Sequence, residues 1–484
     1  MSTVLFHTRS LCPVCLKTLE AAVTEDDHKV YLEKQCRAHG VWKTLIWSDS
    51  SQYLAWMNQS VHEQIYPQTM EQVNGCPHDC GLCKAHEGLA CTAVLEITKR
   101  CNLHCPVCFA DVGRESYDLD LDTIRRMYDG AFRAGGNISV QISGGEPTVR
   151  EDLPEILRIG KEEKGFSHIQ VNTNGIRLAQ EPGYAAKLKE AGADLIYLQF
   201  DSLRDEVYRK TRGRDLLDIK KQAIENCAGA GLGVMLVPVI IKGLNDSEIG
   251  DLVRFAISRI PAVKGIHFQP ISYFGRFPNH EGKPDWDPCN LSDVVRALID
   301  QTGGEMRPED FMPRKKYDAH CSFSAAYYLD EAGTLRPLTV FRPDEPATGE
   351  EDFSALTNVY TNRFWRAYEP TEGCCSVPPT ESSSCTEDSA EEACCEASET
   401  SCCCCGQSFD PFQETGESGL DRLIRRIREY SFSVTGMGFQ DVYSIDLTRL
   451  KGCCVMVIEK DGRAIPLCAY HLTGETGMRL YGKN

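Results

Sequence analysis

The sequence has no long apolar segment, and its basic residues are far fewer than its acidic ones. The longest strongly apolar run, around Val234–Ile241, is much shorter than the ~20 residues of a membrane-spanning helix, so no transmembrane segment is predicted. Residues Met1–Leu11 lack the basic and then apolar pattern of a secretion signal, which favours a cytoplasmic location. The formal charge of −18 argues against nucleic acid as the main partner, because Lys and Arg dominate phosphate binding.

Cysteine, in contrast, is abundant, with 25 in 484 residues. In a reducing compartment, clustered cysteines bind metal more often than they form disulfides. They occur in groups near the two ends of the chain, and only Cys227, Cys289 and Cys321 lie between Cys108 and Cys374. The groups therefore predict several metal sites around a cysteine-poor central region.

The cysteine-poor region alternates apolar, β-rich runs with segments of helical periodicity. Six runs are expected to be strands: Ala93–Ile97, Ile138–Ile142, His168–Val171, Leu195–Phe200, Val234–Val239 and Gly265–Phe268. The helices expected between them are Leu121–Ala134, Leu153–Lys161, Tyr184–Ala191, Asp218–Ala230 and Ser247–Ile260. Right-handed crossovers would curl these units into an α/β fold, a partial (β/α)6 TIM-like barrel. Functional residues are then expected at the carboxyl ends of the strands.

Three cysteines, Cys101, Cys105 and Cys108, follow the first predicted strand. Three thiolates on one short loop can hold three irons of a [4Fe–4S] cluster and leave the fourth iron without a protein ligand. Such an open iron can chelate a ligand through an amine and a carboxylate. The three cysteines alone leave open a structural or electron-transfer cluster, or a zinc knuckle.

A second motif, GGEP, follows the second predicted strand and consists of Gly144, Gly145, Glu146 and Pro147. Its two glycines let the backbone approach a ligand closely, and its glutamate offers an acceptor. Four polar residues follow the third and fourth predicted strands: Asn172, Asn174, Gln199 and Asp201. Turn formation and capping are the alternative roles for these four.

The segment ITKRCNLHCPVCFA, the GGEP motif and the predicted barrel together resemble the radical S-adenosylmethionine (SAM) superfamily. The resemblance implies that a reduced cluster passes one electron to SAM, and that cleavage of the C–S bond gives methionine and a 5′-deoxyadenosyl radical. That radical then abstracts hydrogen from an unactivated C–H bond.

The same resemblance implies roles for individual residues. The GGEP segment would bind the amino group of SAM, and the four polar residues after the third and fourth strands would contact the rest of the cofactor. One position departs from the family. Val107 stands where an aromatic residue often packs on the adenine, and Phe109 is the candidate replacement.

The remaining cysteines predict further metal sites. Cys76, Cys80 and Cys83, with Cys91 as a fourth thiolate, favour a closed auxiliary [4Fe–4S] cluster over a second radical site, because the chain has one GGEP motif. One tetrahedral zinc or iron ion is expected on Cys12, Cys15, Cys36 and His39. A second auxiliary cluster, or alternatively a set of buried thiols, is expected at Cys321, Cys453, Cys454 and Cys468.

Six regions are predicted along the chain. They are a rubredoxin-like or zinc-ribbon-like metal domain (1–60), an auxiliary iron–sulfur segment (61–92), the radical SAM barrel (93–310), a core extension (311–372), a Cys-rich flexible insert (373–418) and a C-terminal α+β region (419–484). The insert is rich in Ser, Glu, Thr and Cys and has almost no large apolar residues, so it cannot build a core.

Longer segments, among them LCPVCLKTLEAAV, GCPHDCGLC and IPLCAYH, resemble one radical SAM subfamily. It contains archaeal tetraether lipid synthases and 7,8-dihydro-6-hydroxymethylpterin methyltransferases. The resemblance covers nearly all of the chain outside the insert, and it implies a metal in the N-terminal ribbon and auxiliary clusters.

Three functions remain open from this resemblance. The first is methylation or alkylation of a small molecule such as a pterin. The second is carbon–carbon coupling of lipid chains, with peripheral membrane contact. The third is non-catalytic electron transfer, against which the GGEP motif argues. A low-potential electron donor such as ferredoxin or flavodoxin is the expected partner.

Overall fold

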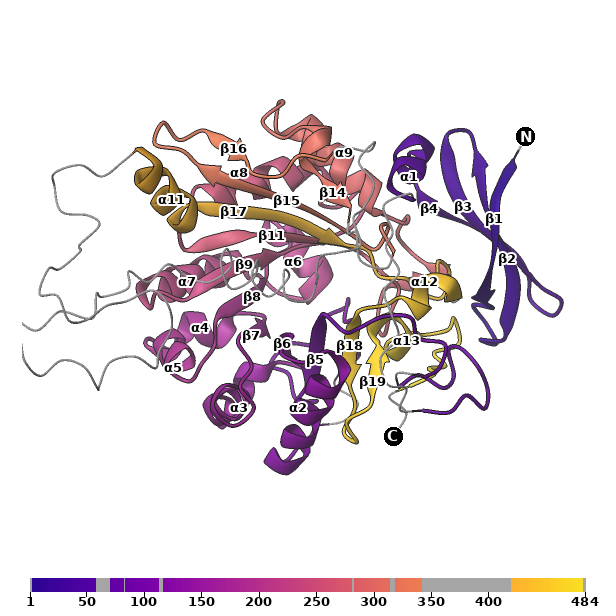
Figure 1. The fold of residues 1–484 in the computed structure, drawn as a ribbon, viewed down its shortest axis with the longest axis horizontal. Coiled ribbons are helices and arrows are strands. Elements are labelled where there is room, and N and C mark those ends of the chain that lie inside the picture. Colours follow the sequence, from indigo (N-terminus) through magenta and orange to yellow (C-terminus); the bar gives the residue numbers. More distant parts are fainter. Residues whose placement is uncertain are drawn as a thin grey trace, which may run out of the picture.

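The computed structural model describes residues 2–57, 70–81, 83–112, 116–280, 283–313, 318–341 and 419–481. The predicted insert at 373–418 lies outside these ranges, as does much of the predicted extension at 311–372. The described strands form a four-stranded antiparallel sheet, a 13-stranded mixed sheet and a two-stranded hairpin (Figure 1). None of the described helices has the length and apolar character needed to cross a membrane.

The N-terminal sheet is a ribbon of four antiparallel strands, β1 (Thr3–Leu11), β2 (Thr18–Asp26), β3 (Lys29–Cys36) and β4 (Gly40–Trp47), followed by α1 (Ser50–Met57). Its buried face packs an aromatic group, in which the Trp47 ring lies 5.9 Å from Tyr53 and 5.4 Å from Trp56. The ribbon meets the C-terminal part of the chain where Thr8 donates a 2.6 Å hydrogen bond to Asp446.

The six predicted barrel strands are all present, and they pair in parallel in their order along the chain. They are β5 (Thr92–Glu96), β6 (Ser139–Ser143), β7 (Ile169–Thr173), β8 (Leu195–Gln199), β9 (Gly233–Val237) and β11 (Val263–Pro270). A short β10 (Val239–Ile240) pairs with the end of β11. The α/β barrel predicted from the alternating pattern is therefore confirmed.

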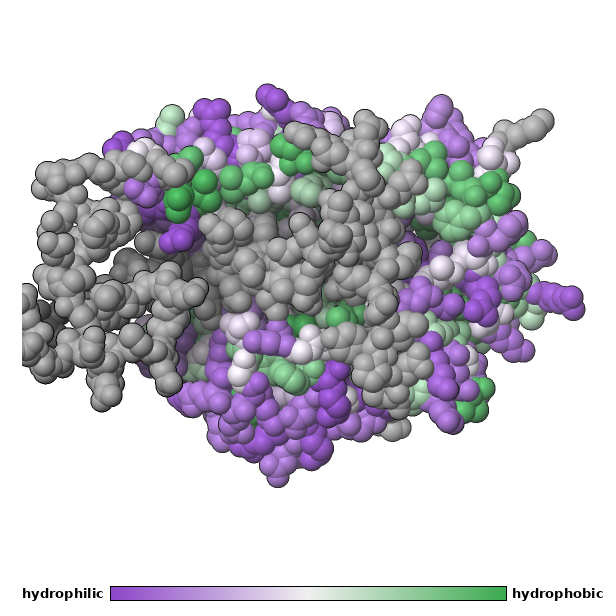
Figure 2. All heavy atoms as spheres, viewed as in Figure 1, coloured by the Kyte–Doolittle hydropathy of each residue, from purple (hydrophilic) through white to green (hydrophobic). Residues whose placement is uncertain are grey.

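The helices around these strands include the five that the periodicity predicted, together with three additions. They are α2 (Leu121–Gly135), α3 (Leu153–Arg158), α4 (Ile176–Gln180), α5 (Tyr184–Glu190), α6 (Asp205–Arg212), α7 (Leu217–Gly229), α8 (Ile249–Ile257) and α9 (Leu291–Gln301). The additions are α4 and α6, which lie between barrel strands, and α9, which follows β11. The exposed sides of α2 and α3 are polar, as Figure 2 shows along the lower edge.

Strands from the end of the chain extend both edges of the barrel sheet. The C-terminal elements are β14 (Met312–Pro313), β15 (Ser322–Leu329), β16 (Leu335–Pro337), α11 (Gly419–Glu429), β17 (Ser431–Met437), α12 (Leu447–Lys451), β18 (Val455–Ile458), β19 (Ala464–Pro466) and α13 (Leu467–Tyr470). Strand β17 pairs in parallel with β11, and β18 pairs in parallel with β5 (Figure 1). The sequence pattern did not indicate this arrangement.

Candidate active site

A cavity of about 290 Å³ opens at the carboxyl ends of the barrel strands. Because side chains alternate along a strand, every second residue points into the barrel. The inward positions that line the cavity are Val94, Glu96, Gln141, Ser143, Asn172, Tyr197, Gln199, Val237 and Gln269. The barrel interior is therefore rich in amide side chains at the level where the predicted motifs meet.

The three cysteines after β5 all line this cavity. Burial raises the pKa of Cys101 to about 12 and raises that of Cys105, and each thiolate disfavours ionisation of its neighbours. The three thiols line one cavity, and soft sulfur ligands suit iron. The donor set therefore fits a [4Fe–4S] cluster with one iron left open.

Two arginines fix the backbone of the cysteine loop, and sequence reasoning did not identify either. Arg276, which follows β11, exchanges backbone hydrogen bonds of 2.8 and 3.0 Å with Cys108, and its Nε donates to the Cys105 carbonyl at 2.8 Å. Arg212 at the end of α6 donates to the Val107 carbonyl at 3.0 Å. Helix and loop positions far along the chain thus hold the loop that carries the three cysteines.

The GGEP glycines allow the cysteine loop to pack against the loop that follows β6. A Cβ at Gly144 would lie 2.5 Å from the Thr98 carbonyl oxygen, and one at Gly145 would lie 2.1 Å from that of Arg100. The backbone N–H groups of Gly145 and Glu146 donate to these same two carbonyls, at 2.8 and 2.9 Å. The close approach predicted from the glycines is therefore, in part, an approach to the protein's own backbone.

Glu146 is buried at the cavity wall and joins this segment to the end of β7. Its Oε1 accepts hydrogen bonds from the hydroxyls of Thr148 (2.7 Å) and Thr173 (2.6 Å), and its Oε2 accepts from the backbone N–H of Asn174 (2.7 Å). These bonds orient the carboxylate toward the cavity that it lines. Pro147 begins a short 3-10 helix and is not among the lining residues.

Three of the four predicted polar residues line the cavity: Asn172, Asn174 and Gln199. Asn172 donates to Gln141 at 3.0 Å, and Asn174 donates to the Asn102 amide oxygen at 2.7 Å. These bonds connect β6, β7 and the cysteine loop across the mouth of the barrel.

The fourth predicted polar residue, Asp201, is fully buried behind the wall. It forms a two-point ion pair with Arg212, with N–O distances of 2.6 and 3.1 Å, and it is Arg212 that reaches the cavity. Lys220 on α7 is a further buried cation, and its Nζ lies 2.9 Å from the Gln199 amide oxygen. Burial lowers the pKa of Lys220 to about 7. No sequence motif indicates Arg212 or Lys220.

Phe109 lies in an aromatic group on the cavity wall. Its ring centroid is 4.4 Å from His471, 4.8 Å from Phe274 and 5.5 Å from Phe439. All four residues line the cavity. The wall is thus built from the cysteine loop, the segment after β11 and the C-terminal part of the chain.

The ribbon brings together the four ligands predicted for a single metal. The ligand atoms of Cys12, Cys15, Cys36 and His39 all lie within 4.8 Å of one another. Backbone N–H donation from Ala38 is the main cause that lowers the pKa of Cys36 to about 6, while burial raises that of Cys12 to about 11. Three sulfurs and one imidazole at this spacing fit a tetrahedral ion.

The grouping of the other cysteines in the structure differs from the grouping that their spacing along the sequence predicted. The Sγ atoms of Cys91 and Cys454 lie 3.0 Å apart, although the spacing had assigned these residues to different groups. Burial raises the pKa of Cys453, and the charges of Cys468, Cys321 and Cys91 add to that effect. Burial likewise raises the pKa of Cys80. The charges of the Cys76 and Cys83 thiols raise that pKa further.

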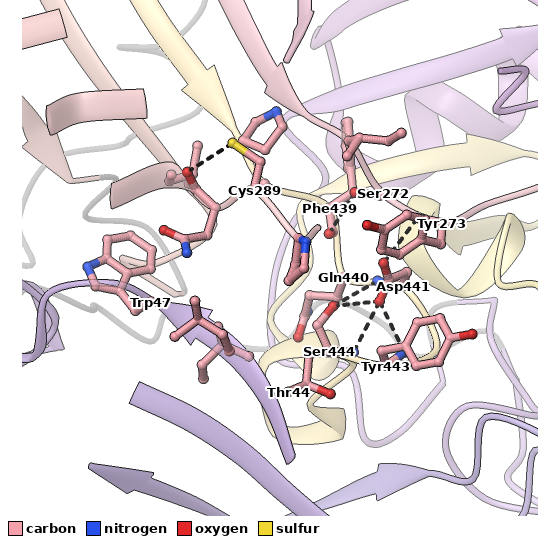
Figure 3. Close-up of a pocket in the computed structure, with 18 of the residues that line it drawn as sticks. Thr44, Trp47, Ser272, Tyr273, Cys289, Phe439, Gln440, Asp441, Tyr443 and Ser444 are labelled. Carbon is pink, nitrogen blue, oxygen red and sulfur yellow. Dashed lines mark hydrogen bonds between the residues drawn. The ribbon is translucent and has the colours of Figure 1, made fainter. Parts of the chain in front are cut away.

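A second, smaller cavity of about 80 Å³ adjoins the first (Figure 3). The two share Pro270, Ile271, Ser272 and Phe439 in their walls. Asp441 holds the shared wall in place by accepting backbone N–H bonds from Tyr273 and Tyr443, both at 3.0 Å (Figure 3). The ribbon forms the far side of the small cavity through β4, so it lies close to the barrel mouth.

Comparison with known proteins agrees with this geometry. Residues 95–256 match the radical SAM superfamily, and residues 4–48 match the HMPTM N-terminal zinc ribbon domain. The fold and the site therefore define a radical SAM enzyme, as the sequence predicted, and enzymes of this class use a [4Fe–4S] cluster and SAM.

The family follows from a relative that matches nearly the whole chain. The 7,8-dihydro-6-hydroxymethylpterin dimethyltransferase of Methanocaldococcus jannaschii is 32% identical over 96% of this chain and 93% of its own length. The chain belongs to the family of that enzyme. A probable GTP 3′,8-cyclase of Methanothermobacter thermautotrophicus is 33% identical over 50% of this chain and 75% of its own length.

Solved radical SAM structures are more distant. SuiB of Streptococcus suis, bound to S-adenosylmethionine, is 19% identical, with 44% of this chain and 47% of SuiB aligned and a TM-score of 0.36.

Proposed function

We propose that the protein methylates a pterin by radical SAM chemistry. The dimethyltransferase that matches 96% of the chain supports a pterin substrate. The observation that carries the proposal is the polar lining of the cavity, where the amides of Gln141, Asn172, Gln199 and Gln269 point inward. Amides can satisfy the ring nitrogens and the oxo group of a heterocycle, and the buried Asn172 Oδ1, to which no described residue donates a hydrogen bond, would stay unsatisfied beside an acyl chain. The same lining argues against coupling of lipid chains.

In this proposal each motif has a separate task. Cys101, Cys105 and Cys108 hold the cluster, which when bound and reduced supplies the electron that cleaves SAM. The GGEP segment and Asn174 orient the cofactor next to the cysteine loop. Arg212 balances the negative charge of the thiolates, since it is the only guanidinium among the described cavity-lining residues. A low-potential ferredoxin or flavodoxin is the proposed electron donor.

We further propose metal sites outside the barrel. The ribbon would hold one zinc or iron ion on Cys12, Cys15, Cys36 and His39. The contact between Cys91 and Cys454 supports a shared auxiliary cluster. Cys76, Cys80 and Cys83 would hold another. Iron and sulfide counts of Cys454→Ala and Cys80→Ala, each set against the parent, would show whether the two variants lose separate clusters.

The test of the function is an anaerobic assay. The reconstituted, reduced protein is given SAM and 7,8-dihydro-6-hydroxymethylpterin, and mass spectrometry measures 5′-deoxyadenosine and methylated pterin. We expect both products from the parent and from Cys227→Ala, a matched control in α7, and neither from the Cys101/Cys105/Cys108→Ala triple variant. Cleavage of SAM by the parent without any pterin product would contradict the proposed substrate.

A further inference from the structure

A carboxylate and a histidine lie together on the wall of the main cavity. Glu96 is the last residue of β5, and His471 directly follows α13. The His471 Nε2 is 3.4 Å from the Glu96 Oε1, and the Lys99 Nζ is 2.8 Å from the Oε2. Glu96 and His471 both line the cavity and are less than 10% exposed. No motif predicted this pair, and the cluster and the GGEP segment do not use it.

The surroundings keep the carboxylate charged and the imidazole neutral. Although burial opposes ionisation, the charge of Lys99 and its hydrogen bond hold the pKa of Glu96 below its usual value. Burial lowers the pKa of His471 to about 4. A carboxylate has about four acceptor positions on its two oxygens, so Lys99 and His471 leave acceptor capacity on both.

Aromatic rings enclose the cavity next to this carboxylate. Phe109 lies 4.4 Å from His471 and is flanked by Phe274 and Phe439, with ring centroids 4.8 and 5.5 Å away. Flat apolar walls beside a charged acceptor suit a planar heterocycle that carries N–H donors on one edge. A pterin has such an edge, because its ring N3–H and its 2-amino group are neighbours.

We propose that Glu96 recognises the 2-amino-4-oxopyrimidine edge of the pterin. The N3–H and the 2-amino group donate to the two carboxylate oxygens, while the rings of Phe109 and Phe439 cover the bicycle. Paired hydrogen bonds to a carboxylate are strong and geometrically selective. This inference rests on the proposed function and assigns its substrate specificity to one residue.

The test compares a dihydropterin with its analogue that has a 2-oxo group in place of the 2-amino group. Calorimetry measures the affinity of each for the reconstituted full-length protein with SAM present. We expect the parent to prefer the pterin by about 10- to 100-fold, the usual range for hydrogen bonds to a charged group. Glu96→Gln should reduce this preference to about threefold or reverse it, because the glutamine amide can donate to the 2-oxo group. Glu225→Gln on the exposed side of α7 is the matched control and should keep the preference of the parent.

The ratio of the two affinities separates recognition from structural damage. If Glu96 only supports the fold through Lys99, Glu96→Gln weakens both ligands equally and the preference is unchanged, which overturns the inference. Equal affinity of the parent for both ligands also overturns it, and the proposed function then still stands if the parent methylates the pterin. A parent that neither binds nor methylates any pterin refutes the proposed function, and the inference with it.

Discussion

Replacing Gly145 by alanine tests whether the GGEP segment and the cysteine loop must pack backbone to backbone. The added Cβ would lie 2.1 Å from the carbonyl oxygen of Arg100 and 2.8 Å from its carbonyl carbon. The first distance is more than about 1 Å shorter than a normal van der Waals contact. Gly145 does not have a positive φ, so the effect of the substitution is steric and involves no backbone strain.

The cysteine loop has little freedom to move away from this Cβ. The backbone of Arg100 is held by the 2.9 Å hydrogen bond from Glu146, and Cys101 follows directly. Overpacking of this kind costs about 1–3 kcal/mol, and we expect the upper end because the neighbour is backbone. The shift also displaces Cys101, a proposed cluster ligand. Gly145→Ala should therefore lower the free energy of unfolding by about 3 kcal/mol and reduce both bound iron and the yield of 5′-deoxyadenosine.

Anaerobic urea denaturation, iron analysis and the SAM cleavage assay measure these effects. Gly229→Ala is the matched control, since no atom lies within 4 Å of its Cβ position in α7. That control should be neutral or more stable by about 0.5–1 kcal/mol, because alanine favours a helix. A Gly145→Ala protein with the iron content, SAM cleavage and stability of the parent would refute the steric reasoning.

Three further predictions concern buried charge and the ribbon metal. Arg212→Met leaves the fully buried Asp201 without its partner, so urea denaturation should show a loss of about 3–5 kcal/mol, much of which the double variant with Asp201→Asn should recover. Cys12→Ala removes one of four ribbon ligands. Metal analysis should show one ion lost per chain together with lower thermal stability, and an unchanged metal content would exclude the site. The pKa of Lys220 is about 7 when folded and ~10.4 when unfolded, so the unfolded chain binds more protons between these values. The Lys220 contribution to the stability of the parent should therefore rise from pH 7 to 10 by at most ~1.4 kcal/mol per unit, and a Lys220→Met variant whose stability changes with pH as the parent's does would contradict this assignment.

The barrel could be predicted because the sequence patterns that indicate its strands and helices each lie within one short segment. Each strand of the core is a short apolar run buried on both faces, and each longer helix shows its own period, so β5 to β11 were found within a few residues. The cysteine loop and GGEP were found for the same reason, since both are short motifs after a strand. Parallel topology then brings them to one sheet edge without further information.

The grouping of the four ribbon residues was also predictable. Its first two cysteines are three residues apart, Cys36 and His39 are again three apart, and antiparallel pairing brings the two turns together. The grouping of the auxiliary cysteines was less predictable. Cys91 and Cys454 are separated by 363 positions, and they meet only because β18 pairs with β5. Spacing alone had grouped Cys91 with its nearest neighbours along the chain.

The sequence by itself therefore determined the class of chemistry, through Cys101, Cys105, Cys108 and the GGEP motif. Only the tertiary structure decided what surrounds that chemistry. It placed Arg212 in the cavity wall and Lys220 against Gln199, and it brought His471 to Glu96 on the cavity wall. The physical reason is that a motif consists of neighbouring residues, so the sequence shows it directly. A cavity wall is formed by strand pairings between distant segments, and local spacing and periodicity do not indicate those pairings.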